Sequence, residues 1–220
     1  VHFTLFGIPV YIRPSFWVVL AIFGGALSIS SVEDLIYPAL FVIAGFVAIL
    51  SHEMGHALVG RKLGGGQQTI VLELFGGLTS SHGMQLTRGG RALMILAGPM
   101  MTLLLGIISL GLTWNIVAPV MTSYNLNFWD LAISPFTAAL ISPKLYILSC
   151  LIMIGEWWTI LNLLPIYPLD GGQLIAQYIR SPRKVFMTGF ITAILIGLLS
   201  FQLFHGYFIP IFMALFAYKI

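Results

Sequence analysis

The chain is built from long, largely apolar runs separated by short polar connections. Six such runs occupy residues 15–32, 37–60, 91–118, 145–164, 185–204 and, shortest, 207–219. Most reach or approach the ~20 residues that cross the hydrocarbon core of a bilayer. Hydrophobic residues make up 59% of the sequence and charged residues only 8%, against about 25% charged residues in soluble domains. The pattern predicts an all-α polytopic membrane protein with about six transmembrane helices.

If six spans alternate in direction, almost all basic residues fall on the same side of the membrane. All of them except Lys144 fall on the side that holds the N-terminus, whereas Lys144 lies opposite, with Glu33, Asp34 and Asp130. By the positive-inside rule, both termini are predicted to be cytoplasmic in a multi-pass protein of the cell membrane. This placement accounts for the net charge of +3 without a nucleic-acid partner. The small size favours a prokaryotic source.

The chain is predicted to form one membrane-embedded domain, residues 1–220, without a PDZ-like or CBS-like segment. Its most irregular part is the connection over residues 61–90. Its middle, TIVLELFGGLTS, is rich in β-branched and aromatic residues and is interrupted by Gly76 and Gly77. This pattern predicts a short β-hairpin. Because unpaired backbone groups cannot face lipid, the hairpin is expected to dip into the membrane only where protein or water covers it.

A stretch of chemically active side chains, His-Glu-Met-Gly-His, follows fifteen uncharged residues. On a helix, residues four apart share a face, so that His52 and His56 can present both imidazoles to one metal ion, with Glu53 beside them to activate a water. Ionisable residues inside a span are costly and are usually functional. The motif predicts a zinc site; the alternative is a histidine pair satisfied by neighbouring polar groups.

A third ligand is expected elsewhere, since catalytic zinc usually has three protein ligands and an open position for water. The best candidate is Asp170 in LNLLPIYPLDGGQ, where Pro165 and Pro168 interrupt a span. Broken helices at membrane depth are tolerated where they line a cavity or are buried in protein. The alternative is that Asp170 only caps a helix that resumes at Gln173.

Two of these stretches, SHEMGHALVG and NLLPIYPLDGGQ, together resemble the site-2 protease family of intramembrane zinc metalloproteases, whose pattern joins a helical H-E-x-x-H to a later N-x-x-P-x-x-P-L-D-G. The resemblance extends over about residues 3–200. It implies one Zn²⁺ per chain on His52, His56 and Asp170, with Glu53 as the catalytic residue. It also implies that Asn162 helps to hold the substrate.

Two further elements of that family are recognisable. ELFGGLTS resembles its membrane-dipping sheet, and LAGPMMT resembles its G-P-x-x-N element, except that Thr102 stands where the family usually has asparagine. The expected function is an intramembrane endopeptidase that cleaves within or next to transmembrane segments of membrane-anchored proteins, as in regulated intramembrane proteolysis. Its partners would be a transmembrane protein or peptide substrate and the lipid bilayer.

A transmembrane substrate hides its scissile carbonyl in helical hydrogen bonds, so that it must be held extended for attack. The hairpin is predicted to offer an unpaired edge for β-strand addition. The alternative is that it only packs against the helices. The residues assigned to this substrate contact are Val71, Leu72, Glu73, Leu74, Phe75, Gly76 and Gly77.

Two other classes of protein remain as alternatives. A metal or proton-coupled transporter would also carry ionisable residues on broken helices, but no second segment repeats either motif, as the inverted repeats of transporters would. An inactive relative would bind membrane partners without cutting them, and the complete ligand and base set speaks against it. Glu156 lies in the middle of a span and is left without an assigned role.

Overall fold

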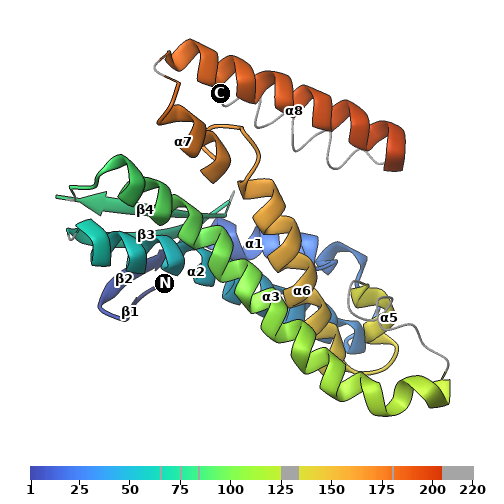
Figure 1. The fold of residues 1–220 in the computed structure, drawn as a ribbon. Helices are drawn as coiled ribbons and strands as arrows, with labels where there is room; N and C mark the ends of the chain where they lie inside the picture. Colours follow the sequence, from blue (N-terminus) through green and yellow to red (C-terminus); the bar gives the residue numbers. More distant parts are fainter. Residues whose placement is uncertain (65, 75, 84, 125–133, 180, 205–220) are drawn as a thin grey trace. The chain divides into compact units, whose positions relative to one another are not determined.

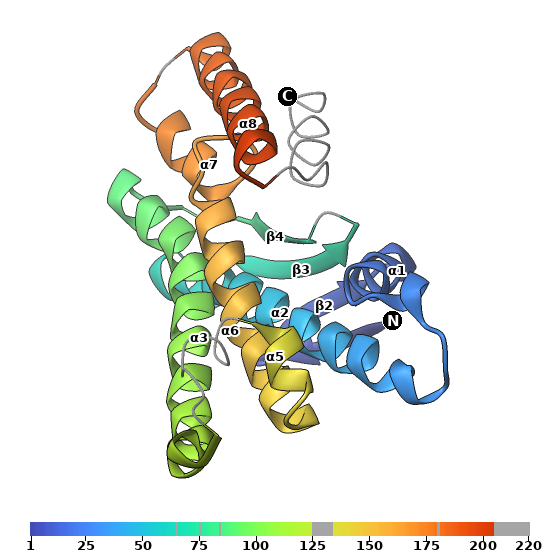
Figure 2. The same cartoon turned by 90° about the vertical axis from the view of Figure 1, so that its right-hand side faces the viewer.

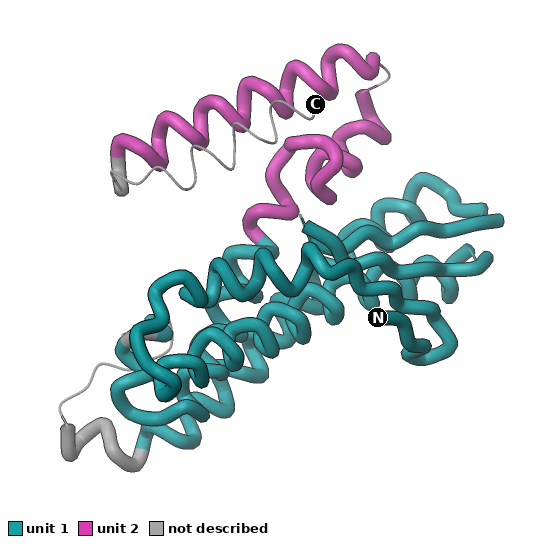
Figure 3. Tube along the Cα trace, turned by 180° about the vertical axis from the view of Figure 1, so that it is seen from behind, with its two compact units in different colours: residues 1–159 teal, residues 160–220 magenta. Residues whose placement is uncertain are grey.

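The computed structural model describes residues 1–64, 66–74, 76–83, 85–124, 134–179 and 181–204. Within them, long helices accompany a small β-sheet (Figure 1). The chain divides into two compact units, residues 1–159 and 160–220, which Figure 3 shows in teal and magenta. The boundary falls in the last turn of helix α6 (Pro143–Asn162).

Four helices in the described part of the chain are long and apolar enough to cross a membrane. They agree with four of the predicted spans, at 37–60, 91–118, 145–164 and 185–204. These helices are α2 (Ile36–Gly64), α3 (Arg88–Tyr124), α6 and α8 (Pro182–Phe204).

The predicted span at 15–32 is wrong as a single helix. Helix α1 (Pro14–Phe23) has ten residues, or about 15 Å, which is half of the ~30 Å that a span needs. It ends at Gly24, and Gly25 has a φ of 87°, a left-handed conformation that glycine adopts at little cost. Two 3₁₀ turns follow, η1 (Ala26–Ser28) and η2 (Glu33–Leu35). The sixth predicted span, 207–219, lies outside the described residues.

A four-stranded sheet, in the order β1-β2-β3-β4, joins the N-terminus to the predicted hairpin (Figure 2). The hairpin is confirmed as an antiparallel pair of β3 and β4, but its pairing with a second hairpin, β1–β2, was not predicted. β2 and β3 are parallel, with α1 and α2 between them in the chain. The strands are β1 (His2–Leu5), β2 (Ile8–Ile12), β3 (Gln67–Glu73) and β4 (Gly76–His82).

One face of this sheet forms a hydrophobic core with the first two helices. Side chains alternate between the two faces of a strand, and the alternate residues Ile8, Val10 and Ile12 of β2 and Ile70 and Leu72 of β3 are all buried. They pack in one cluster with residues of α1 and α2, among them Phe16, Leu20, Ile49, Met54 and Ala57. The sheet therefore fixes the half of α2 that carries the histidine motif.

Glycines allow α2 and α3 to approach closely. A Cβ at Gly55, inside the histidine motif, would overlap the backbone carbonyl of Ala97 on α3, and one at Gly60 would lie 2.9 Å from the Met94 sulfur. Small residues at a crossing let two helix backbones come together. Gly55 thus accounts for how a turn of α3 comes to lie directly against the two histidines.

The second unit contains α7 (Asp170–Ala176) and α8, with a small core around Ile166 and Ala193. A Cβ at Gly171 would overlap the Leu163 carbonyl, and one at Gly172 would overlap the backbone at Ile166. The two glycines therefore let the first turn of α7 pack tightly on the preceding segment. This helix begins at Asp170, three residues earlier than the sequence suggested.

Candidate metal centre

The two histidines of the motif lie side by side on one face of α2. Their ring centroids are 4.7 Å apart, with the ring planes nearly perpendicular. The Nε2 atoms of His52 and His56 face each other at 3.0 Å. Both side chains are buried, with 2% and 7% of their surface exposed. The helix spacing therefore produces the paired nitrogen donors that the sequence predicted.

The orientation of His56 is fixed by the backbone of α3. Its Nδ1 lies 2.8 Å from the Met94 carbonyl oxygen. Because a carbonyl only accepts hydrogen bonds, Nδ1 carries the proton, and in the neutral ring Nε2 then presents a lone pair. Histidines that bind metals commonly donate their other ring N–H to such an acceptor. The amino-acid sequence gives no sign of this contact, because it involves a main-chain atom.

Gly98 lets the backbone of α3 lie close against the His56 ring. A Cβ at residue 98 would overlap the Nε2 and Cε1 atoms of His56. Imidazole nitrogens are typical zinc ligands, and here two of them converge beside a position that carries no side chain. The donor type, the facing Nε2 atoms and the ring orientation together fit a metal ion held on His52 and His56.

Glu53 lies on the same turn of α2 and is 4% exposed. Its Oε2 accepts a 2.7 Å hydrogen bond from the Thr79 hydroxyl on β4. A Cβ at Gly77 would overlap the Glu53 side chain, so that β4 approaches the carboxylate as closely as backbone can. Thr79 was not singled out from the sequence, although it lies two positions after Gly77 and therefore shares its face of the strand.

The predicted substrate-binding residues occupy different parts of the hairpin. Val71 and Leu72 lie on β3, which pairs with β2 on one side and β4 on the other. The unpaired edge predicted for the hairpin is therefore not on this strand. Glu73 forms a 2.9 Å ion pair with Arg13. Leu74 is exposed at the turn, and Phe75 lies outside the described residues.

On β4, by contrast, one edge has no strand partner among the described residues. Gly76 begins this strand with a φ of 116°, and a Cβ there would lie 2.6 Å from the Trp158 ring on α6. Gly76 and Gly77 together allow the strand to pass between the Trp158 ring and the Glu53 carboxylate. The glycines of the predicted hairpin are thus explained by close approach at both faces.

Thr102, which stands where the resembled family usually has asparagine, joins α3 to α6. It is completely buried, and its hydroxyl lies 2.9 Å from that of Thr159. Both hydroxyls also lie within hydrogen-bonding distance of the Pro99 carbonyl, at 3.0 and 3.3 Å. The polar contact at this position is therefore a hydroxyl pair that connects two helices one turn beyond Gly98.

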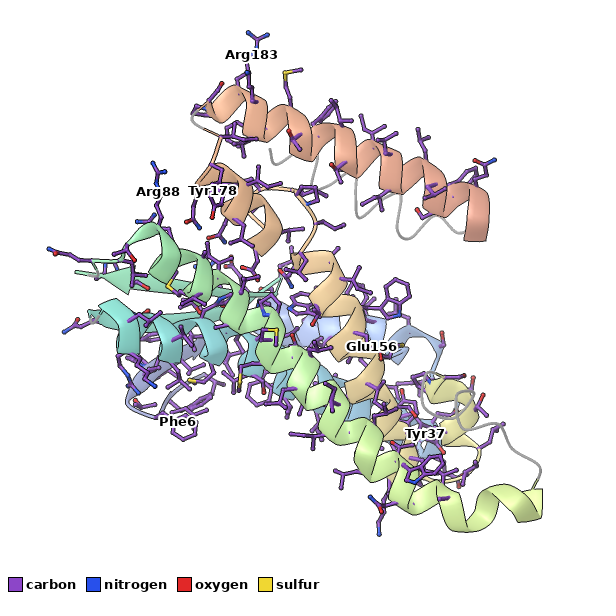
Figure 4. All side chains as sticks on the ribbon, viewed as in Figure 1. Phe6, Tyr37, Arg88, Glu156, Tyr178 and Arg183 are labelled. Atoms are coloured by element: carbon purple, nitrogen blue, oxygen red, sulfur yellow. The ribbon has the colours of Figure 1, made fainter. Side chains whose placement is uncertain are left out.

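Three further residues of interest occupy α6 and α7. Asn162 is the last residue of α6, and Asp170 is the first residue of α7, where Leu169 is the N-cap. Both side chains are buried. Glu156, in contrast, is exposed on α6 (Figure 4).

Comparison with known proteins gives consistent matches. A family model described as peptidase family M50 matches residues 40–204. A zinc metalloprotease of Methanocaldococcus jannaschii is 29% identical over 227 residues, which cover 98% of this chain and 57% of that protein. A candidate zinc metalloprotease of Synechocystis is 28% identical over 188 residues, or 80% of this chain and 43% of that protein. The chain thus spans about half the length of the curated relatives it matches.

A solved structure has the same fold. The site-2 protease from Methanocaldococcus jannaschii aligns with a TM-score of 0.63 over 99% of this chain and 92% of that chain, at 23% identity. The resemblance drawn from the two motifs is therefore confirmed, and the apolar helices are those of a multi-pass membrane protein. Because the family match includes the histidine motif, the hairpin and the aspartate motif and covers well over half of the residues, the chain belongs to peptidase family M50.

Proposed function

We propose that this chain is an intramembrane zinc endopeptidase that cleaves a peptide bond within or next to a transmembrane segment of a membrane-anchored substrate. The observation that carries the proposal is the buried group on one turn of α2. Two imidazoles face each other, one is oriented by a backbone carbonyl, and a carboxylate lies beside them. A helix long and apolar enough to cross a bilayer holds all three side chains.

The ligand set that we propose for one zinc ion consists of His52, His56 and Asp170. Two imidazoles and a carboxylate are a common set for catalytic zinc, which keeps a fourth position for water. In support, Asp170 is a buried carboxylate at the start of α7, directly after a proline-interrupted segment. When bound, the zinc would supply Lewis acidity that lowers the pKa of a water ligand toward ~7.

The protein residues then have distinct tasks. Glu53 takes a proton from the attacking water and later donates it to the leaving amine. The Met94 carbonyl keeps His56 in the tautomer that presents Nε2. Burial of these groups excludes bulk water, and a low local dielectric strengthens each electrostatic interaction in the site.

We propose that the substrate backbone binds in extended form along the open edge of β4. This is β-strand addition, in which main-chain hydrogen bonds supply affinity, and it lets a substrate helix exchange its own hydrogen bonds for new ones. The Asn162 amide would bond the backbone exposed at the scissile peptide. In this scheme β3 contributes by holding β4 in register.

Photocrosslinking tests the strand that binds substrate. A photoreactive phenylalanine analogue at Leu78, which is 54% exposed on β4, is expected to cross-link a single-span substrate in an inactive Glu53→Gln background. The same analogue at Phe6, which is 67% exposed in the β1–β2 turn, serves as the matched control. Equal cross-linking at both positions would argue against a β4-specific site.

The distribution of charge supports a cytoplasmic position for the sheet. Arg61 and Lys62 lie in the last turn of α2, and Arg88 begins α3. Figures 1 and 2 show both helix ends beside the sheet, whereas α6, which carries Lys144 in its first turn, begins near the opposite end of α3. By the positive-inside rule we propose that the sheet end faces the cytoplasm.

Metal removal tests the proposed activity directly. Dialysis of the detergent-solubilised protein against a chelator is expected to abolish cleavage of a single-span substrate, because the histidines would hold the zinc that makes the attacking water acidic enough for Glu53 to deprotonate. Readdition of one equivalent of Zn²⁺ should restore cleavage, read on gels and by mass spectrometry of the products. Cleavage that persists without metal would refute the proposal, and zinc-dependent metal flux in liposomes without cleavage would favour a transporter.

A further inference from the structure

A threonine hydroxyl on β4 lies within hydrogen-bonding distance of the turn of α2 that carries Glu53. The Thr79 Oγ1 lies 2.7 Å from Glu53 Oε2 and 3.1 Å from the Glu53 main-chain oxygen. A hydroxyl has one proton to donate, and an ionised carboxylate only accepts. The shorter contact is therefore a charge-assisted hydrogen bond from Thr79 to the carboxylate, the stronger class of hydrogen bond.

The strand is built to bring this hydroxyl to Glu53. Thr79 and Gly77 face α2 together, opposite Ile70 and Leu72 of β3 in the hairpin register. Both of those β3 side chains are completely buried in the core, so that the register cannot slip without exposing them. The missing side chain at Gly77 removes the obstacle to close approach, and the β-branched Thr79 has a restricted χ1 that holds its hydroxyl in place.

We infer that Thr79 is a positioning residue, which orients the Glu53 carboxylate toward the water that attacks the substrate. This inference rests on the function proposed above. Since Thr79 lies on the strand whose open edge would receive the substrate, one element holds both the extended peptide and the base. β4 would bind the substrate backbone at its open edge and hold the Glu53 carboxylate through Thr79. The strand therefore sets the distance between the scissile carbonyl and the base, which the flexible glutamate side chain alone would not fix.

Three variants of Thr79, compared with the wild type, separate the hydroxyl from the bulk of the side chain. Thr79→Val keeps the shape and removes the hydroxyl, and Thr79→Ala removes both. Thr79→Ser keeps only the hydroxyl, and wild type keeps both. We expect kcat to fall by about 10- to 100-fold in the Val and Ala variants, because a hydrogen bond to a charged group is lost and the base is misplaced. The Ser variant should retain most of the wild-type kcat.

Three readouts distinguish positioning from a structural or binding role. KM and bound zinc are expected to stay at their wild-type values in Thr79→Val. Its thermal unfolding midpoint should fall no further than the loss of one buried hydrogen bond requires and stay above the assay temperature. The matched control is Thr113→Val on α3, where a buried hydroxyl donates to the Ser109 carbonyl of its own helix; its kcat should be unchanged. In a Glu53→Gln background, Thr79→Val should cause no further loss of the residual rate.

The outcomes are separable. If wild type cleaves and the rates follow side-chain size, with Val equal to Thr and Ser equal to Ala, the inference is overturned while the proposed function stands. A rise in KM with unchanged kcat would overturn it too, since Thr79 would then act in substrate binding. A wild type that holds zinc but never cleaves overturns the proposed function, and this inference with it.

Discussion

Glu53→Gln is expected to reduce cleavage of a single-span substrate to a small residual rate while the protein keeps its zinc. Glutamine has the same shape, and its amide oxygen can still accept the Thr79 hydrogen bond that the carboxylate accepts at 2.7 Å. It cannot take a proton from water, however, and general base catalysis by a positioned side chain contributes about 10² to 10⁴ in rate. The proposed ligands His52, His56 and Asp170 are untouched. Cleavage rates and zinc stoichiometry would be measured on the same preparations.

The control for this variant is Glu33→Gln, which makes the same chemical change at an exposed position in η2. Its rate and zinc content should equal those of wild type. A Glu53→Gln protein that cleaves at the wild-type rate would remove Glu53 from the mechanism. Loss of zinc together with activity would instead assign Glu53 to metal binding.

Gly98→Ala is expected to disrupt the metal centre from a neighbouring helix. The new Cβ would overlap His56 Nε2, the atom whose lone pair the Met94 carbonyl keeps available through Nδ1. Either the imidazole rotates away and loses that hydrogen bond, or α3 moves back from α2. Changes around a metal ligand typically lower metal affinity or activity by about 10- to 100-fold. Zinc affinity, measured by competition with a chelator, should fall at least that much.

Gly111→Ala on the same helix is the matched control, since a Cβ at that position meets no atom within 4 Å. It should bind zinc and cleave like wild type, and alanine also raises helix propensity slightly. If Gly98→Ala bound zinc as tightly as Gly111→Ala, the ligand position at His56 Nε2 would be wrong.

The parts of the fold that the sequence predicted correctly are those with a strong local signal. Four spans are marked by length and apolarity, and the hairpin by β-branched residues around Gly76 and Gly77. The helical spacing of His52 and His56 was enough to predict that their rings meet. In each case neighbouring residues in the chain decide the outcome, because helix and hairpin contacts are local.

The sequence-based predictions fail where a turn interrupts an apolar run or where contacts between distant parts of the chain determine the structure. The run at 15–32 is apolar enough for a span, but Gly24 and Gly25 end its helix early. The β2 strand contains Pro9, which weakens a strand prediction, and it pairs with β3 more than fifty residues away in the chain. In the described part of the chain, that pairing leaves β4 as the strand of the hairpin with an open edge.

In the candidate site, too, some residues could be predicted from the sequence and others only from the structure. Residue types nominate His52, His56, Glu53 and Asp170, because imidazoles and carboxylates are rare inside apolar runs. The groups that orient them carry no such signal. A backbone carbonyl at Met94, a missing Cβ at Gly98 and a common strand residue, Thr79, become informative only when the three-dimensional contacts are known.

The parallel pairing of β2 with β3 also sets an order of events during biosynthesis. β2 ends at Ile12 and β3 begins at Gln67, so that the ribosome makes α1 and all of α2 before the strand meets its neighbour. A lone two-stranded hairpin is marginally stable, and the nascent β1–β2 pair lacks its permanent support throughout that interval. The helix with the histidine motif is therefore complete before the strand that carries Thr79 exists. The buried surroundings of Glu53 arise only when the sheet closes, after the helix beneath it has been made.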